Sequence, residues 1–320
     1  MRVSRHQLDD RYKAIYENQL GEGNSLWEFH PGKVVLPGFF ENYVGRILDA
    51  PIRKDDVWLV SYPKTGSTWC QEMIWLIQNN LDFEGSRRVL QQVRAPLIEA
   101  SVVLFEFTSL FGDDFTNSVD YVANLPSPRA IKTHLPLELL PTQLDKVKPK
   151  IIYTMRNPKD VCVSYYFHSQ LLHDFYVDFD TFCEMFLNDA IAYGSFFNHC
   201  FEAWNKRHEG NILIIRYEDM KKDAKKTVRN IADFLGKTLS DTEVDMIDSY
   251  LSFECMRKNK GCNVEALTDK KHGEHSFDKT GIHFLRKGQV GDWKNYMSEE
   301  MSRKFDEWIK KNTQGTDLRF

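Results

Sequence analysis

Short apolar stretches alternate with longer amphipathic segments along this chain, and this alternation constrains the fold more than any other feature. The apolar stretches are 57–61, 129–134, 150–155 and 211–217. The helical patterns between and after them are 67–80, 159–172 and 182–208. Apolar strands separated by helices are typical of βαβ units, in which a buried parallel sheet carries helices on both faces. The sequence therefore predicts an α/β fold of this kind.

The remaining pattern predicts one domain over residues 1–320. No stretch between residues 40 and 310 resembles a linker, and the chain has no internal repeat. Positions 258–281 are polar, contain glycine and are rich in Lys and His, so we expect a long surface loop there and a candidate lid. The segment 298–312 has the pattern of an amphipathic closing helix.

Charge and composition exclude several classes of partner. The net charge is −4, so no overall basic field would recruit nucleic acid or an anionic membrane. No stretch approaches the roughly 18 apolar residues of a membrane span, and the N-terminus lacks the apolar core of a signal peptide. The six cysteines are scattered without a CxxC pair, which is typical of free thiols. We expect a cytoplasmic protein.

The stretch SYPKTGSTWC, residues 61–70, joins the first strand to the first helix. It should therefore lie at the carboxyl edge of the sheet, where open α/β proteins bind their ligands and where a helix N-terminus favours an anion. Gly66 would let backbone approach an oxyanion, Ser67 and Thr68 would add hydroxyl donors, and Lys64 would add a charge. A simple helix cap with a solvated lysine explains the same residues equally well. The Walker pattern is absent, which weakens a nucleoside triphosphatase interpretation.

The segment YPKTGSTW resembles the 5′-phosphosulfate-binding loop of the cytosolic sulfotransferases. These enzymes transfer a sulfuryl group from 3′-phosphoadenosine 5′-phosphosulfate (PAPS) to a hydroxyl or an amine. Further segments match the family in order: IKTHLPLELLP (131–141), RNPKDVCVSYY (156–166), IRYEDM (215–220), SFECM (252–256) and FLRKGQVGDWK (284–294). The resemblance spans residues 30–310 and implies the P-loop-like sulfotransferase fold.

The resemblance also implies a catalytic group. In IKTH, strand periodicity places Lys132 and His134 on the same side. A lone histidine is more often a surface or core residue, but the family motif makes His134 the general base that deprotonates the acceptor hydroxyl. The motif assigns Lys64 to the bridging and leaving oxygens and Lys132 to the transferring sulfuryl oxygens. With two lysines there, and no carboxylate pair beside the loop, no metal is expected.

For the donor, the resemblance implies two segments that bind the 3′-phosphate and aromatic residues that bind the adenine. Arg at a strand end is often a structural ion pair, but the family motif places Arg156 and Ser164 at the 3′-phosphate, together with the segment 286–288. Trp69 and Phe253 would flank the adenine. The expected donor-binding residues are Lys64, Thr65, Gly66, Ser67, Thr68, Trp69, Arg156, Ser164, Tyr217, Phe253, Met256, Arg286, Lys287 and Gly288.

The acceptor is expected to be the hydroxyl of a small, aromatic or hydrophobic alcohol. Aromatic clusters in the chain would suit the walls of such a pocket, although any single Phe is more often ordinary core. The resemblance to the family implies Phe39, Phe105 and Phe107 near the acceptor, with Lys132 and His134. The stretch SYYFH departs from the frequent Tyr-Tyr-His-Phe order of the family and leaves the acceptor preference open.

Two further expectations concern the oligomeric state and the functions other than sulfuryl transfer that the sequence leaves open. Many relatives dimerise through K-x-x-x-T-V-x-x-x-E; here KNYMSEEMSR keeps Lys294 but has Ser298-Glu299 and Arg303, so the homodimer of the family is not expected. A P-loop kinase would need magnesium and ATP, and the position of the lysine disfavours it. A catalytically silent nucleotide or ligand carrier would bind without turnover, and the retained Lys64, Lys132 and His134 disfavour it.

Overall fold

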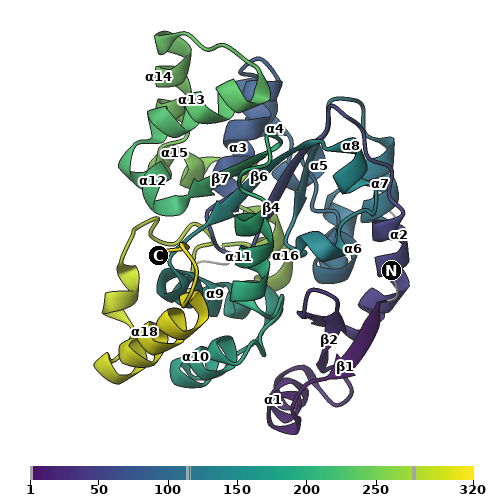
Figure 1. The fold of residues 1–320 in the computed structure, drawn as a ribbon, viewed down its shortest axis with the longest axis vertical. Helices are drawn as coiled ribbons and strands as arrows, with labels where there is room; N and C mark the ends of the chain where they lie inside the picture. The colour runs from purple at the N-terminus through teal and green to yellow at the C-terminus, as the bar shows by residue number, and fades with distance from the viewer. Residues whose placement is uncertain (1–2, 113–114, 116, 276–278) are drawn as a thin grey trace.

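The computed structural model describes residues 3–112, 115, 117–275 and 279–320. Its centre is a four-stranded sheet with the strand order β5-β4-β6-β7 (Figure 1). The strands are β4 (Val57–Ser61), β5 (Ala130–Thr133), β6 (Lys150–Met155) and β7 (Ile212–Arg216). All neighbours pair in parallel, so the four carboxyl ends meet at one edge. The predicted parallel sheet is confirmed.

Each face of the sheet packs against its own group of helices, because alternate side chains of a strand point to opposite faces. Trp58 and Val60 belong to one hydrophobic cluster and Val57 and Leu59 to another. The first face is covered by α9 (Pro158–His173), α10 (Phe179–Leu187), α11 (Phe196–Asn205) and α18 (Glu299–Thr313) (Figure 1). The second is covered by α3 (Ser67–Gln78), α12 (Tyr217–Lys222), α13 (Ala224–Leu235) and α14 (Asp241–Tyr250) (Figure 1). The expected α/β architecture, with helices on both faces, is therefore correct.

A second, antiparallel sheet precedes this core and was not expected from the sequence. It has the order β1-β2-β3, with β1 (Ser4–Gln7), β2 (Leu26–His30) and β3 (Val34–Pro37). In the sequence, α1 (Asp10–Leu20) connects β1 to β2. Gly32 (φ 93°) and Lys33 (φ 50°) turn the chain between β2 and β3. The apolar residues Leu26, Trp27 and Phe29 of LWEFH, followed by Pro31 and Gly32, were the available signal for this hairpin.

Short elements connect these layers. The helices are α2 (Glu41–Leu48), α4 (Phe83–Arg88), α5 (Gln91–Arg94), α6 (Ala100–Val103), α7 (Ser118–Asn124), α8 (Leu144–Val147), α15 (Phe253–Lys258) and α16 (Glu265–His272). The 3₁₀ turns are η1 (Gly38–Phe40), η2 (Phe105–Leu110), η3 (Leu137–Leu139) and η4 (Asp292–Asn295).

The helix predicted over 182–208 is wrong, because two helices, α10 and α11, share that segment. Between them Asp189, Tyr193 and Gly194 adopt positive φ values of 56°, 67° and 61°, which end a helix. A Cβ on Gly194 would lie 2.2 Å from the Lys33 carbonyl oxygen, so the turn packs tightly on the N-terminal sheet. Ser195 then caps α11, since its side chain accepts a hydrogen bond from the Asn198 N–H.

The surface loop predicted over 258–281 is also wrong in its central part. Helix α16 occupies 265–272, and Val264 and Leu267 are buried in a cluster with Phe107 and Leu171. The high Lys and His content misled the prediction, because these residues form the last turn of α16 while its apolar residues face inward. Positions 276–278 of this segment lie outside the described residues. The closing helix predicted at 298–312 is confirmed as α18.

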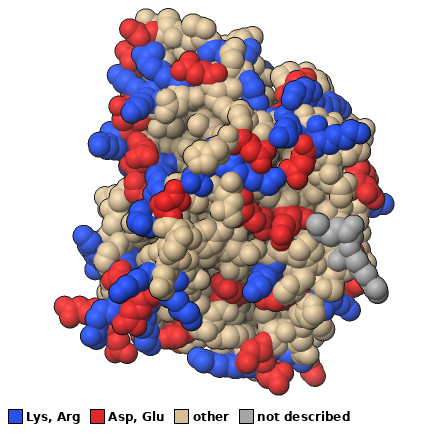
Figure 2. Space-filling model, viewed as in Figure 1, with Lys and Arg blue, Asp and Glu red and all other residues tan. Residues whose placement is uncertain are grey.

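The surface mixes both signs of charge. On the face shown in Figure 2, Lys and Arg side chains alternate with Asp and Glu side chains. Within the described residues, no helix combines the length and the apolar character needed to cross a membrane.

Candidate active site

The turn after β4 is held in a conformation that requires glycine. Gly66 has φ 92° and precedes the first residue of α3, and a Cβ there would lie 2.5 Å from Cδ2 of Tyr217. The Thr65 hydroxyl donates to the Tyr62 carbonyl (2.9 Å) and lies 2.8 Å from Oγ1 of Thr154. The Thr65 side chain is therefore buried within the sheet and fixes the turn, while Lys64, Ser67 and Thr68 line the space outside it.

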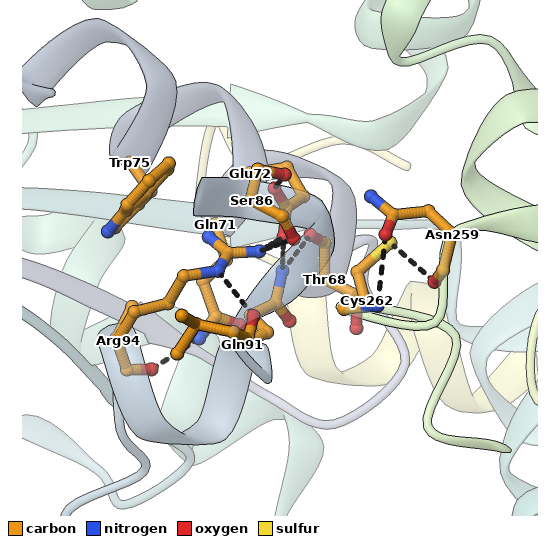
Figure 3. Close-up of polar contacts among 12 residues, drawn as sticks. Thr68, Gln71, Glu72, Trp75, Ser86, Gln91, Arg94, Asn259 and Cys262 are labelled. Atoms are coloured by element: carbon orange, nitrogen blue, oxygen red, sulfur yellow. Dashed lines mark hydrogen bonds and ion pairs between the residues drawn. The ribbon is translucent and has the colours of Figure 1, made fainter. Parts of the chain in front are cut away.

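A buried carboxylate anchors the first turns of α3 from the side (Figure 3). Glu72 is fully buried, accepts hydrogen bonds from Ser86 (2.9 Å) and from Nε2 of Gln91 (2.7 Å), and pairs with Arg94. The same Gln91 amide donates to the backbone carbonyl of Thr68 at 3.1 Å. Helix α3 and the turn before it are thus fixed to the segment 83–95.

A cavity of about 210 Å³ lies at the carboxyl edge of the sheet. Residues directly after each of β4, β5, β6 and β7 line it, which is where ligands of open α/β sheets bind. All residues assigned to the donor except Thr65 line this cavity, namely Lys64, Gly66, Ser67, Thr68, Trp69, Arg156, Ser164, Tyr217, Phe253, Met256, Arg286, Lys287 and Gly288. Lys132 and His134 line the same cavity. The structure therefore brings together segments that are up to 224 residues apart in the chain (64 to 288).

His134 has its two ring nitrogens in different surroundings. Nδ1 lies 2.7 Å from the carbonyl oxygen of Ser61, which can only accept, so Nδ1 carries the proton and donates it. Nε2 is then the unprotonated nitrogen. Burial, followed by the charge of Lys132, holds the pKa of His134 well below its usual value. The imidazole is accordingly neutral near pH 7 and able to accept a proton.

Glu99 is a buried carboxylate beneath His134 that the sequence reasoning missed. It accepts hydrogen bonds from the backbone N–H of His134 (2.6 Å), from the Thr133 hydroxyl (2.9 Å) and from the Tyr193 hydroxyl (3.2 Å). Burial raises its pKa to about 7, against the opposing effect of these hydrogen bonds. An acid within the apolar run APLIEA was the signal that could have revealed it.

The lysines of the cavity repel one another. The pKa of Lys64 is lowered to about 7 by burial and then by the charges of Lys132, Arg156 and Arg286. Burial lowers the pKa of Lys132 to about 8, although the nearby Glu99 opposes the shift. A bound anion would offset both the repulsion and the lost hydration, so the cavity is electrostatically suited to a phosphate or a sulfate.

Two guanidinium groups border the cavity. Arg156 donates to the carbonyl oxygens of Lys64 (3.2 Å) and Gln289 (2.9 Å), and its guanidinium carbon lies 4.2 Å from the centre of the Tyr217 ring. Arg286 donates to Asp292 at 2.7 Å. Within the part of the chain that the structure describes, the buried Nε atoms of Arg156 and Arg286 have no hydrogen-bond partner. The hydrogen-bonding capacity of these two buried donors is thus unused in the described chain.

The backbone at 286–288 closes the cavity on that side. Lys287 pairs with Asp292 at 3.0 Å, so this carboxylate holds both cations of the segment. Gly288 has φ 62°, and a Cβ there would lie 2.5 Å from Cδ2 of Phe253. Only glycine lets this backbone approach the Phe253 ring so closely.

Aromatic rings form another wall of the cavity. Trp69 and Tyr217 meet edge to face, with ring centroids 6.4 Å apart, and Phe253 lines the same cavity. Among the described residues, the buried indole N–H of Trp69 has no acceptor. Such a wall suits the flat face of a nucleobase.

A second cavity, of about 600 Å³, adjoins the first. Phe39, Phe105 and Phe107 all line it, and the rings of Phe39 and Phe105 meet edge to face at 5.7 Å. Phe107 is buried, whereas Phe105 is 55% exposed. Residues that line both cavities, and so form a shared wall, are Val103, Leu104, Tyr165, Leu172, His173 and Tyr193. The predicted acceptor residues thus divide between the cavities, with the phenylalanines in the second and Lys132 and His134 in the first.

No group of three or more His, Cys, Asp or Glu side chains in the described ranges is placed to hold a metal ion.

Comparison with known proteins gives consistent matches. The family model for the sulfotransferase domain matches residues 54–317. Luciferin sulfotransferase of Photinus pyralis is 40% identical over 275 residues, which cover 83% of this chain and 74% of that protein. Sulfotransferase 1B1 of Canis lupus familiaris is 38% identical over 273 residues, covering 84% and 86% of the two chains.

The fold also matches solved structures over its whole length. Two structures of retinol dehydratase, one with androsterone and the inactive cofactor PAP and one with retinol and PAP, each have a TM-score of 0.89 at 30% identity. The match covers 100% of this chain and 98% and 99% of theirs. The chain therefore belongs to the sulfotransferase family and is a transferase of the sulfuryl-transferring class.

Proposed function

We propose that this enzyme transfers the sulfuryl group of PAPS to the hydroxyl of a hydrophobic alcohol. In this proposal the nucleotide binds in the 210 Å³ cavity and the body of the acceptor binds in the adjoining 600 Å³ cavity. The observation that carries the proposal is that Lys64, Lys132 and His134 line one cavity, which shares a wall with a larger aromatic one.

The residues of the first cavity fit the donor. Gly66 and Gly288 let the backbone pack closely against the aromatic wall of this cavity, because a Cβ at either position would collide with the ring of Tyr217 or Phe253. Arg156 and Arg286 line this cavity and supply positive charge for a phosphate. The structural neighbours crystallised with PAP support the same class of nucleotide.

The transfer needs little from the protein beyond positioning and charge. When bound, PAPS supplies a sulfuryl group whose leaving group is a phosphate. His134 accepts the hydroxyl proton at Nε2, while its Nδ1–H stays bonded to Ser61. Lys64 and Lys132 stabilise the negative charge on the leaving and transferring oxygens, the task that a metal ion performs in many phosphoryl transfers.

For the acceptor we propose an elongated, apolar alcohol. The second cavity has the volume of a site for a drug-sized molecule, and aromatic side chains contribute much of its wall. Retinol dehydratase, which shares the fold, is known with retinol and with androsterone. The hydroxyl would reach His134 past Tyr193, whose ring lies 5.4 Å from the imidazole.

We further propose that the chain acts as one domain in the cytoplasm, without nucleic-acid or membrane partners. The second cavity is lined by residues of the N-terminal sheet and of α9 and shares a wall with the first cavity at the central sheet, which supports one functional unit. The described cysteines are free thiols, as is usual in a reducing compartment.

The proposal is tested by a binding assay and a transfer assay in parallel. Calorimetry should show binding of 3′-phosphoadenosine 5′-phosphate without added metal. Labelled PAPS should then sulfate members of a panel that runs from simple phenols to terpenoid and steroid alcohols. His134→Ala should keep nucleotide binding and lose transfer, whereas His208→Ala, at a position that lines neither cavity, should keep both. Absence of nucleotide binding at millimolar concentration would sink the proposal.

The same assays separate the two alternative functions. Binding of the nucleotide without sulfation of any panel member would favour a silent carrier. Magnesium-dependent turnover of ATP would favour a kinase.

A further inference from the structure

A second histidine faces the lysine of the donor turn. His168 lies on α9, one turn after Ser164, and lines the first cavity. Its Nδ1 is 3.3 Å from Nζ of Lys64. The same ammonium lies 4.3 Å from the centre of the Phe284 ring. Lys64 is thus held between a hydrogen-bond acceptor and an aromatic face.

The order of two residues on α9 creates this contact. The frequent family order Tyr-Tyr-His-Phe would place phenylalanine at position 168, whereas this chain has Phe167 followed by His168. Consecutive helical residues point about 100° apart, so the exchange moves the imidazole to another face of the helix. Here Phe167 packs beneath the guanidinium of Arg286, at 4.6 Å, and His168 faces Lys64.

The positive charges around His168 and Lys64 favour the neutral form of the imidazole and disfavour the charged form of the lysine. Burial, followed by the charge of Lys64, holds the pKa of His168 well below its usual value. Lys132, Arg156 and Arg286 disfavour the charge on Lys64. Nδ1 of a neutral His168 can accept from the ammonium, which a phenylalanine could not do.

We propose that His168 is a positioning residue for Lys64, which accepts a hydrogen bond from its ammonium and keeps it charged and directed into the cavity before the donor binds. The neighbours of His168 support this location, since Tyr165 and His173, whose rings lie 5.9 and 5.5 Å from it, belong to the wall between the two cavities. The inference rests on the proposed function, because it assumes that Lys64 acts on the donor.

His168→Phe removes the acceptor and should make Lys64 lose its proton at lower pH. The alkaline limb of kcat/KM for PAPS should therefore shift down by about one pH unit, because this parameter reports the free enzyme. kcat should shift less, since the bound anion keeps Lys64 charged in the complex. His168→Asn, which retains an acceptor near the position of Nδ1, should restore the alkaline limb. The double variant Phe167→His/His168→Phe, with the family order, should behave like His168→Phe.

Thermal unfolding of each variant shows whether it folds, and binding of 3′-phosphoadenosine 5′-phosphate measured between pH 6 and 9 provides a readout apart from turnover. An active wild-type enzyme whose His168→Phe variant has an unchanged pH profile in both assays would overturn the inference. An equal loss at all pH values, not rescued by His168→Asn, would assign His168 a packing role only and would also overturn it. Failure of the wild type to bind the nucleotide would instead reject the proposed function.

Discussion

At the scale of single residues, the proposed base His134 depends on partners that no motif contains. The common location of Lys64, Lys132 and His134 in one cavity was predictable, because the family resemblance identifies all three and strand period places Lys132 and His134 on one side. Glu99 was not, because its role arises only when the β5 strand, the start of α6 and Tyr193 come together. His168 was visible only as a change of residue order, and its contact with Lys64 depends on how α9 faces the turn after β4.

Glu99→Gln should lower kcat by about 10–100-fold with little loss of nucleotide binding. The amide keeps the size of the carboxylate but removes the charge near Lys132, and its NH₂ group faces donors that need an acceptor. Steady-state kinetics and calorimetry with 3′-phosphoadenosine 5′-phosphate measure the two effects. Glu299→Gln, at an exposed position of α18, is the matched control. Wild-type kcat in Glu99→Gln would contradict this role.

The pH dependence of the free enzyme should be bell-shaped. On the alkaline side, kcat/KM for PAPS should fall as Lys64, whose pKa is lowered to about 7, loses the proton that the donor needs. On the acid side it should fall only well below pH 6.5, because burial and Lys132 lower the pKa of His134, the proposed base. A profile measured from pH 5 to 10 checks both limbs. A rate that rises continuously to pH 10 would be inconsistent with a charged Lys64.

At the scale of elements, the strands and their parallel pairing were predictable, and the turns between helices were not. Buried parallel strands have a strong apolar signal, so 57–61 and 150–155 agree with β4 and β6. The break between α10 and α11 depends on packing of Gly194 against the N-terminal sheet, which the local pattern does not contain. That break also brings Tyr193 beside His134, so the missed turn contributes to the site.

Gly288→Ala should weaken binding of 3′-phosphoadenosine 5′-phosphate by about tenfold or more. The added Cβ would lie 2.5 Å from the ring of Phe253 and displace it from the cavity wall, which removes stacking worth about 1–3 kcal/mol. Gly291→Ala is a close control, since it has a similar positive φ of 80° but no atom within 4 Å of the new Cβ. Calorimetry compares the two. Equal losses in both variants would attribute the effect to backbone strain alone.

At the scale of the whole molecule, a buried ion pair and the candidate active site lie at opposite edges of the central sheet. Arg129 and Asp56 are fully buried before β5 and β4 begin, and two hydrogen bonds of 2.7 and 2.6 Å join them. The site lies past the other ends of the same strands. The alternation of strands and helices predicted this architecture, but the ion pair, like the antiparallel N-terminal sheet, depends on contacts distant in sequence.

Asp56→Asn should lower the free energy of unfolding by about 3–5 kcal/mol, because it leaves the Arg129 charge buried without a counter-ion. Urea denaturation measures the change. Asp55→Asn, one residue earlier and exposed, should change stability by less than about 0.5 kcal/mol. At urea concentrations below its denaturation midpoint, where it is folded, Asp56→Asn should retain the kcat of the wild type. If Asp56→Asn had the same free energy of unfolding as Asp55→Asn, the Arg129–Asp56 ion pair would not contribute to stability.

The assembly of the protein should not use the dimer contact of the family. In the corresponding stretch, Ser298 caps α18 and Arg303 is exposed where relatives have a glutamate. Light scattering should therefore give the same mass for the wild type and for Lys294→Glu. The triple variant Ser298→Thr/Glu299→Val/Arg303→Glu restores the family motif and should increase the mass towards that of a dimer. Dissociation of a wild-type dimer by Lys294→Glu would refute this expectation.

The wall between the two cavities has a practical consequence for altering the enzyme. Phe39, Phe105 and Phe107 line only the second cavity, which we propose for the acceptor, so exchanges among them should change which alcohol is accepted and leave nucleotide binding unchanged. Tyr165, His173 and Tyr193 border both chambers, and a new side chain at any of them alters two binding events at once. Variant libraries for new acceptors should therefore begin at Phe39, Phe105 and Phe107 and leave Tyr165, His173 and Tyr193 in the shared wall unchanged.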